Sequence, residues 1–203
     1  DSSLKHGHAG LLMFKAAADY DNVVASPSPQ VTLVNDTFEM FNGFRWTRLS
    51  GQWTVTTGDN PQYVQTSTAG NATLITGIST RNQSVQARAA PIAFGAGDGR
   101  WFGLFARYRD SGNYYYVTLR NNNQISLRKL VGGAIQVLDS APLPVTTQIA
   151  YTVRLETIQN ELRVYVDGRL VLEATDTSHA WGRYGAVMFM TAISYDNVLA
   201  TQP

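Results

Sequence analysis

The sequence predicts an all-β protein, built as a two-sheet antiparallel jelly-roll sandwich. From Asp36 onward, short runs of alternating apolar and polar residues are separated by turn residues. No segment shows the spacing of an amphipathic helix. With 203 residues the chain is long enough for one filled sandwich. About a dozen strands at this spacing require two packed sheets.

Each expected strand is an alternating run that ends at a turn signal. Asn-Asn and Asp-Gly pairs, as at 121–123 and 167–168, tolerate the positive φ angles of tight hairpins. The prolines and glycines at 58–61, 95–99 and 132–133 mark further turns. The strands predicted in this way span residues 52–56, 63–66, 72–76, 84–92, 101–108, 114–120, 124–130, 135–138, 150–157, 161–166, 169–174, 185–190 and 194–200.

The two ends of the chain carry the same segment twice. Residues 1–28 and 176–203 align without a gap at an offset of 175, with 12 identities in 28, including the motif YDNV at 20–23 and 195–198. A repeated segment of this kind indicates a tandem array. The predicted organisation is the tail of a preceding repeat at 1–28, a proline-containing linker at 29–34, and one jelly-roll module at 35–203.

Both copies carry the sequence that should close one sandwich, and only one can occupy that place. We expect the C-terminal copy to close its own module, because that connection is native to it. The N-terminal copy would then pair at a sheet edge, or with a second chain in a strand-exchanged homodimer. A circular permutation, in which residues 1–27 displace the C-terminal copy, is the remaining alternative.

Composition excludes several classes of function. The formal net charge is +1, so no global field attracts nucleic acid or a membrane, and we expect neither as a partner. There is no cysteine, which removes disulfide scaffolds and thiolate chemistry. The apolar stretches are shorter than the ~20 residues that span a bilayer. The chain has no initiator Met or signal peptide, and we expect it to be a mature or excised fragment.

Several runs in the second half of the chain have a familiar pattern: GLFARYRD at 103–110, NYYY at 113–116, ISLRK at 125–129, LRVYVDG at 162–168 and the closing YDNV. Together they resemble the concanavalin A-like lectin/glucanase superfamily. More narrowly, they are similar to the laminin-G-like modules appended to bacterial pectate lyases and other polysaccharide-degrading enzymes. The similarity covers about residues 36–200.

The resemblance implies a non-catalytic carbohydrate-binding module of a secreted polysaccharide-degrading enzyme, in a bacterial protein that is secreted or held at the cell surface. The same sandwich also serves as lectin, lyase, hydrolase or spacer in this superfamily. One alternative is therefore a structural or adhesive tandem repeat of a bacterial surface protein. A weaker alternative is a polysaccharide lyase.

The residues needed for catalysis on this fold are not found in the sequence. Glucanases of this superfamily carry an E-x-D-x-x-E pattern, and none of the four glutamates stands in such an arrangement. The R-x-E-x-R and Q-[IV]-H patterns of jelly-roll alginate lyases are missing too. His6 and His8 lack a third metal ligand nearby, and a solvated turn explains them better. We therefore expect no catalytic residues.

Strand alternation predicts a polar face that could bind an anionic polysaccharide, such as pectate or alginate. Arg supplies 13 of the 16 cations, and its planar fork matches carboxylate and sulfate groups. Aromatic faces stack on sugar rings. An ordinary solvated sheet, covered by Arg and Tyr, is the alternative. If sequential strands are neighbours, the outward-pointing binding residues are Arg88, Trp101, Arg107, Tyr114, Tyr116, Arg120 and Arg128.

A structural Ca²⁺ ion is also expected. Binding modules of the jelly-roll type often hold one where the first and last strands meet, with acidic side chains and carbonyls as ligands. Asp36 and Glu39 open the module and Asp196 closes it, so these three are the predicted ligands. The alternative is a turn-capping aspartate and an exposed glutamate. Asp21 is the counterpart of Asp196 in the other copy.

Overall fold

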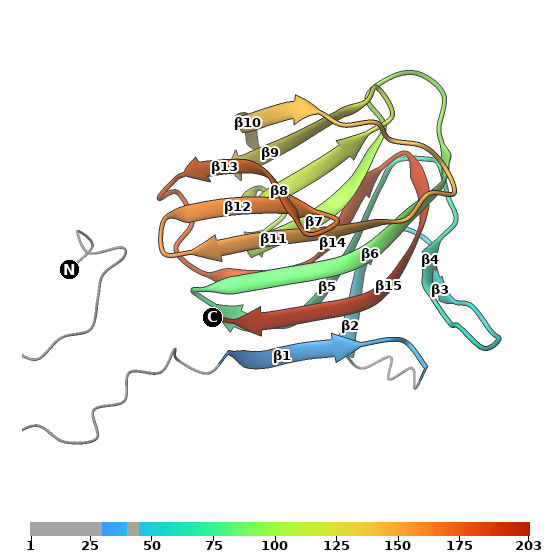
Figure 1. Ribbon diagram of the computed structural model, residues 1–203, viewed down its shortest axis with the longest axis horizontal. Helices are drawn as coiled ribbons and strands as arrows, with labels where there is room; N and C mark the ends of the chain where they lie inside the picture. Colours follow the sequence, from blue (N-terminus) through green and yellow to red (C-terminus); the bar gives the residue numbers. More distant parts are fainter. Residues whose placement is uncertain (1–29, 40–44) are drawn as a thin grey trace, which may run out of the picture.

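The computed structural model of this chain describes residues 30–39 and 45–203. In this part of the chain, two antiparallel β-sheets pack face to face (Figure 1). The predicted all-β jelly-roll sandwich is therefore confirmed.

The first sheet has eight strands and contains the C-terminal strand near its middle. β15 pairs along one edge with β6, while its other edge pairs first with β4 and then with β1. In spatial order the strands are β13 (Arg169–Thr175), β12 (Glu161–Val166), β11 (Tyr151–Ile158), β6 (Gln83–Phe94), β15 (Thr191–Gln202), β4 (Tyr63–Gln65) and β3 (Trp53–Val55), with β1 (Val31–Asp36) beside the end of β15.

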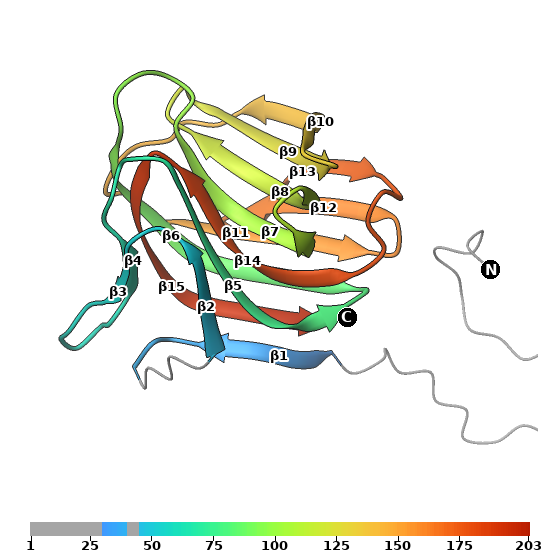
Figure 2. The same ribbon diagram turned by 180° about the vertical axis from the view of Figure 1, so that it is seen from behind.

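The second sheet has seven strands, and Figure 2 shows it from behind the first view. Four of its strands, β7 to β10, follow one another in sequence as a meander. The spatial order is β10 (Ala134–Pro142), β9 (Gln124–Val131), β8 (Asn113–Arg120), β7 (Trp101–Asp110), β14 (Gly182–Phe189), β5 (Asn71–Thr80) and β2 (Trp46–Ser50).

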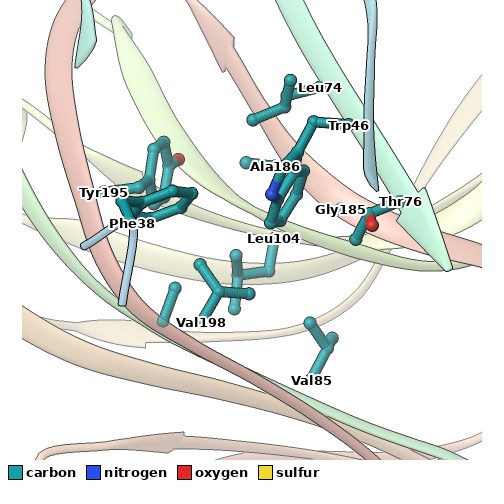
Figure 3. Close-up of a pocket in the computed structure, with 11 residues that line it drawn as sticks. Phe38, Trp46, Leu74, Thr76, Val85, Leu104, Gly185, Ala186, Tyr195 and Val198 are labelled. Atoms are coloured by element: carbon teal, nitrogen blue, oxygen red, sulfur yellow. The ribbon is translucent and has the colours of Figure 1, made fainter. Parts of the chain in front are cut away.

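The core lies between the sheets and is filled by the apolar residues of each alternating run. The inward set of β6 is buried as predicted, and it faces the inward residues of β7, β8 and β9. The cavity in this core, lined by side chains such as Trp46 and Tyr195, holds about 10 Å³ (Figure 3). One water needs at least that much space. This part of the sandwich therefore has no room for an internal ligand.

The C-terminal copy of the repeated segment supplies a central strand to each sheet. β14 lies between β7 and β5, and β15 lies between β6 and β4. This is the placement expected for a segment that closes its own module. The N-terminal copy, 1–28, lies outside the described residues, so its pairing or strand exchange stays a prediction.

The module begins earlier than the sequence predicted. Residues 31–34 were expected to form part of a linker, but β1 begins at Val31 and pairs with β15 as far as Asp36. Backbone pairing with β15 makes these residues a strand, although their sequence shows no clear alternation of apolar and polar residues. β2 was missed for the same reason, because four of its five residues are exposed. Within the described residues, no helix is long or apolar enough to cross a membrane.

Candidate functional site

The outward face of the seven-stranded sheet carries an apolar cluster of its own, separate from the core. Ile75, Phe105, Tyr116 and Val187 are buried in it although they point away from the other sheet. Partly buried side chains surround them: Trp101, Tyr108, Tyr114 and Leu130. A contiguous apolar patch on the outer face of a sheet typically marks an interaction site or a ligand-binding groove.

Five aromatic rings of this cluster form a continuous surface, which we call the aromatic floor: Trp101, Phe105, Tyr108, Tyr114 and Tyr116. Neighbouring ring centroids are 5.1 Å apart for Phe105 and Tyr108, and 5.4 Å for Tyr108 and Tyr114. The chain of contacts continues over 5.3 Å from Tyr114 to Tyr116 and 5.7 Å from Tyr116 to Trp101. All five rings come from β7 and β8, so the sheet itself fixes their spacing.

A groove runs over the aromatic floor. One part, of about 500 Å³, is lined by Trp101, Tyr114 and Tyr116 together with β5, β9 and β14 residues. A second part, of about 460 Å³, shares Leu49, Tyr108 and Ser111 with the first and extends to Trp181. The combined groove follows β7 from its first residue to its last. It is therefore long enough for several units of a chain-like ligand.

Two of the predicted arginines stand beside the aromatic floor. Arg120 is the cross-strand neighbour of Trp101, and Arg128 is the neighbour of Tyr116. Burial raises the pKa of the Tyr116 hydroxyl, while the adjacent Arg128 and Arg120 guanidinium groups oppose this rise. Burial also raises the pKa of Tyr114, to about 12, so both phenols stay protonated and can donate hydrogen bonds.

A β-bulge in β7 corrects two predicted orientations. Strict alternation placed Arg107 outward and Tyr108 inward, but the pairing of β7 with β8 shifts after Ala106. Arg107 has a φ of 50°, in the left-handed region that non-glycine residues rarely adopt. The extra residue reverses the alternation, so Arg107 points inward and Tyr108 joins the aromatic floor.

Arg107 is therefore a structural residue rather than a ligand contact. Its side chain is 2% exposed, and its guanidinium donates to backbone carbonyls from three separate segments. The acceptors are Arg81 O at 2.9 Å, His179 O at 2.8 Å, Thr157 O at 3.2 Å and Gln159 O at 2.6 Å.

Arg88 does not belong to the groove either. It lies on β6, is exposed, and is paired with Thr152 and Asp196 in the eight-stranded sheet. The prediction assumed that sequential strands are neighbours, but the chain crosses from one sheet to the other between β6 and β7. Of the seven predicted binding residues, the structure brings together Trp101, Tyr114, Tyr116, Arg120 and Arg128.

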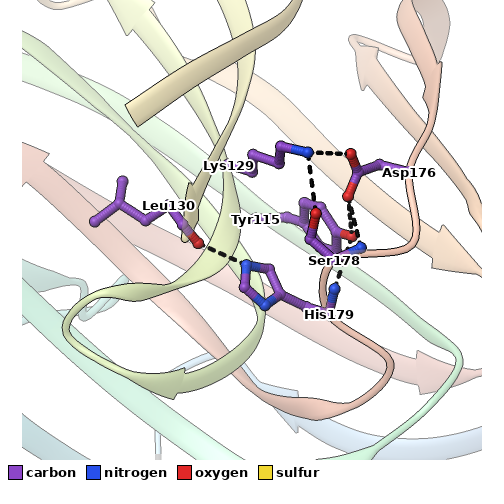
Figure 4. A network of polar contacts seen from close by, with 6 residues as sticks. All are labelled: Tyr115, Lys129, Leu130, Asp176, Ser178 and His179. Carbon is purple, nitrogen blue, oxygen red and sulfur yellow. Dashed lines mark hydrogen bonds and ion pairs between the residues drawn. The ribbon is translucent and has the colours of Figure 1, made fainter. Parts of the chain in front are cut away.

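A polar network behind the floor fixes the β9 side of the groove (Figure 4). The Asp176 carboxylate pairs with Lys129 of β9 and accepts a hydrogen bond of 2.7 Å from the Tyr115 hydroxyl. His179 is buried and its Nε2 contacts the carbonyl of Leu130 at 2.6 Å. Leu130 lines the groove, so this network ties the 176–181 segment to a groove wall.

The pKa values in this network depend on burial and on the hydrogen bonds. Burial alone would raise the pKa of Asp176, but the hydrogen bonds from Lys129, Tyr115 and Ser178 outweigh it and hold the pKa well below its usual range. Burial lowers the pKa of His179. At neutral pH, Asp176 is thus ionised and His179 is neutral.

The residues predicted to hold calcium have other roles in the structure. The Asp36 carboxylate accepts one hydrogen bond from the Phe38 amide at 2.9 Å and one from the Trp46 indole at 2.8 Å. Asp196 accepts from the Asn197 amide, and Glu39 is exposed. Among the described residues, no three His, Cys, Asp or Glu side chains form a group that could hold a metal ion. Calcium binding stays a prediction.

Sequence reasoning missed several groove residues. Tyr108 was missed because of the bulge, for which the sequence contains no glycine signal at residue 107. Ile75, Leu130 and Val187 were missed because an apolar residue in a strand is normally assigned to the core. Their three strands do not follow one another in sequence, so only the sheet order brings them together.

Comparisons with known proteins agree with this fold. No family model matches the chain. A levanase of Bacillus subtilis is 23% identical over 162 residues, which are 78% of this chain and 23% of the levanase. The chain thus spans less than a quarter of that relative.

Among solved structures, the carbohydrate binding module CBM66 of Bacillus subtilis matches with a TM-score of 0.64 and 21% identity, over 75% of this chain and 92% of that one. A β-glucanase of Bacillus licheniformis matches with a TM-score of 0.61 and 10% identity, over 85% and 98% of the two chains. The concanavalin A-like fold is confirmed. The narrower likeness to laminin-G-like modules stays a prediction.

Proposed function

We propose that this chain is a non-catalytic carbohydrate-binding module of a secreted polysaccharide-degrading enzyme, and that its ligand lies in the groove over the aromatic floor. The observation that carries the proposal is the floor itself: five aromatic rings on the outer face of a sheet, in an open groove. The match to part of a levanase and the fold likeness to a carbohydrate binding module support it.

The chemistry of the groove suits a sugar chain. A sugar ring has an apolar face that packs on an aromatic ring, and hydroxyl groups at its edge that need hydrogen-bond partners. The floor provides the rings, while Asn71, Thr73 and Ser111 of the groove wall provide polar partners. We further propose that the polysaccharide is anionic, pectate- or alginate-like, because Arg120 and Arg128 border the floor.

The groove favours binding over catalysis. Glycoside hydrolysis commonly requires two carboxyl groups on either side of the scissile bond. Of the described residues that line either part of the groove, Asp110 alone carries a carboxyl group.

The proposal can be tested by affinity electrophoresis in gels that contain levan, pectate or alginate. We expect at least one polysaccharide to retard the protein. Trp101→Ala should abolish most of this retardation, because the loss of one stacking ring from the aromatic floor removes contact area with the sugar. Circular dichroism checks that the variant is folded.

Tyr165→Ala provides the matched control. Tyr165 is a partly buried aromatic residue on the outer face of the eight-stranded sheet, where the Arg154 guanidinium lies 3.9 Å from its ring centroid. The control should be retarded like the wild type. Equal loss in both variants, or no retardation by any polysaccharide, would contradict the proposal and favour a structural or adhesive repeat. Unsaturated products after incubation with polyuronates would instead indicate a lyase.

A further inference from the structure

Four unpartnered polar atoms gather at one place beside the aromatic floor. Thr118 and Ser126 are direct cross-strand neighbours on β8 and β9, and both point outward, away from the core. Their side chains are 0% and 1% exposed, yet neither hydroxyl has a hydrogen-bond partner. The Nε atoms of Arg120 and Arg128 are also buried without a partner. Because β8 and β9 are antiparallel, these two arginines flank the Thr118–Ser126 pair on opposite sides, each two residues away on the same face.

We call this group the arginine–hydroxyl site: Thr118, Arg120, Ser126 and Arg128. Buried polar atoms without partners are rare, because each loses its hydrogen bonds to water and gains none in return. Nine such side-chain atoms occur in the described part of the chain, and four of them belong to this site. Such a concentration on one outward patch points to a partner that the free protein does not supply.

The charge of the site is also uncompensated. Among the described residues, the ion pairs join Lys129 to Asp176, Arg154 to Glu156 and Arg163 to Glu161, and none includes Arg120 or Arg128. Burial lowers the pKa of Arg120, and the neighbouring positive charge of Arg128 lowers it further. An anion between them would relieve both effects.

The surroundings limit what kind of anion fits. Arg120 is paired with Trp101 and Arg128 with Tyr116, two rings of the aromatic floor whose centroids are 5.7 Å apart. An acidic group at this site would therefore belong to a molecule that also covers the floor. A guanidinium fork matches the planar or tetrahedral oxygens of a carboxylate or a sulfate.

We propose that the arginine–hydroxyl site binds one oxyanion, a carboxylate or a sulfate, carried by the sugar unit that lies on Trp101 and Tyr116. This inference rests on the proposed function and makes it specific. The acidic substituent of the sugar is recognised at one end of the groove, by side chains of β8 and β9. The rest of the groove, from Phe105 to Trp181, would contact the remainder of the sugar chain.

The test compares ligands that differ only in the acidic group. Isothermal titration calorimetry is done with polygalacturonate and its methyl-esterified form, and with dextran sulfate and dextran. We expect one acidic ligand to bind at least about tenfold more tightly than its neutral form, as charge-assisted hydrogen bonds imply. The preference should weaken with salt, since the site is only partly buried. The pair that shows it identifies carboxylate or sulfate as the natural group.

Three variants locate the effect. Arg120→Gln and Arg128→Gln should each remove most of the preference for the acidic ligand, measured as the ratio of its affinity to the affinity of its neutral form. Arg88→Gln is the matched control, because this exposed arginine lies on the other sheet, and it should behave as the wild type. If acidic and neutral forms bind alike, or if the control loses as much as the two variants, the inference is overturned while the proposed function stands.

Inorganic sulfate separates the two proposals further. Without any sugar, sulfate should raise the Tm of the wild type and of Arg88→Gln more than that of Arg120→Gln, since binding to the folded state stabilises it. If sulfate has this effect but no polysaccharide binds, the anion site is supported and the carbohydrate-binding role is overturned. Equal shifts in all three proteins would overturn the anion site.

Discussion

Replacement of Arg107 by Met should destabilise the protein strongly without altering the groove. The guanidinium of Arg107 joins the bulge of β7 to three other segments through four backbone carbonyls. Methionine fills a similar volume but donates no hydrogen bond. The carbonyls of His179 and Thr157, which accept the two fully buried bonds, would then lack a partner.

The expected loss follows from these two carbonyls. An orphaned buried acceptor costs about 1–3 kcal/mol, so two of them cost about 2–6 kcal/mol. Burial of the charge lowers the pKa of Arg107, and this unfavourable burial disappears in the variant. We therefore expect the free energy of unfolding to fall by about 2–4 kcal/mol, a large part of the ~5–15 kcal/mol of a typical domain.

Urea denaturation followed by tryptophan fluorescence measures this change. Arg109→Met is the control, because Arg109 is exposed and its guanidinium lies over the Trp181 ring at 5.5 Å, a contact worth about 0.5–1 kcal/mol. A loss in Arg107→Met no larger than in the control would refute the structural role of the buried guanidinium. Loss of sugar binding in the folded Arg107→Met variant would indicate that Arg107 contributes to ligand binding after all.

Two further predictions concern pH and calcium. Because burial lowers the pKa of His179 in the folded state, stability should be fully present above the unfolded value of about 6.5 and fall as the pH drops below it. His179→Gln should remove this fall in Tm between about pH 6.5 and 5, and an unchanged pH profile would contradict the assignment. If Asp36, Glu39 and Asp196 hold calcium as the sequence predicts, EDTA should lower the Tm, and a Tm indifferent to EDTA would end that hypothesis.

The candidate site shows how far strand alternation can be followed from the sequence. Alternation placed Tyr114, Tyr116, Arg120 and Arg128 on one outer face correctly, because β8 and β9 are regular and joined by a short turn. It failed at Arg107, because one bulged residue reverses the orientation of every side chain that follows it. It failed at Arg88, because adjacency in sequence does not imply adjacency in a sandwich whose chain crosses between sheets.

The sequence by itself determined the fold class, the strands of the second half and the duplication of the ends, because these depend on local periodicity and on direct comparison of residues. Only the tertiary structure decided which strands are neighbours, and so which side chains share a surface. The aromatic floor takes its rings from β7 and β8, but its apolar surroundings come from β5, β9 and β14. That the Nε atoms of Arg120 and Arg128 are buried without a hydrogen-bond partner likewise follows from packing, because the three-dimensional arrangement decides which groups lie near them.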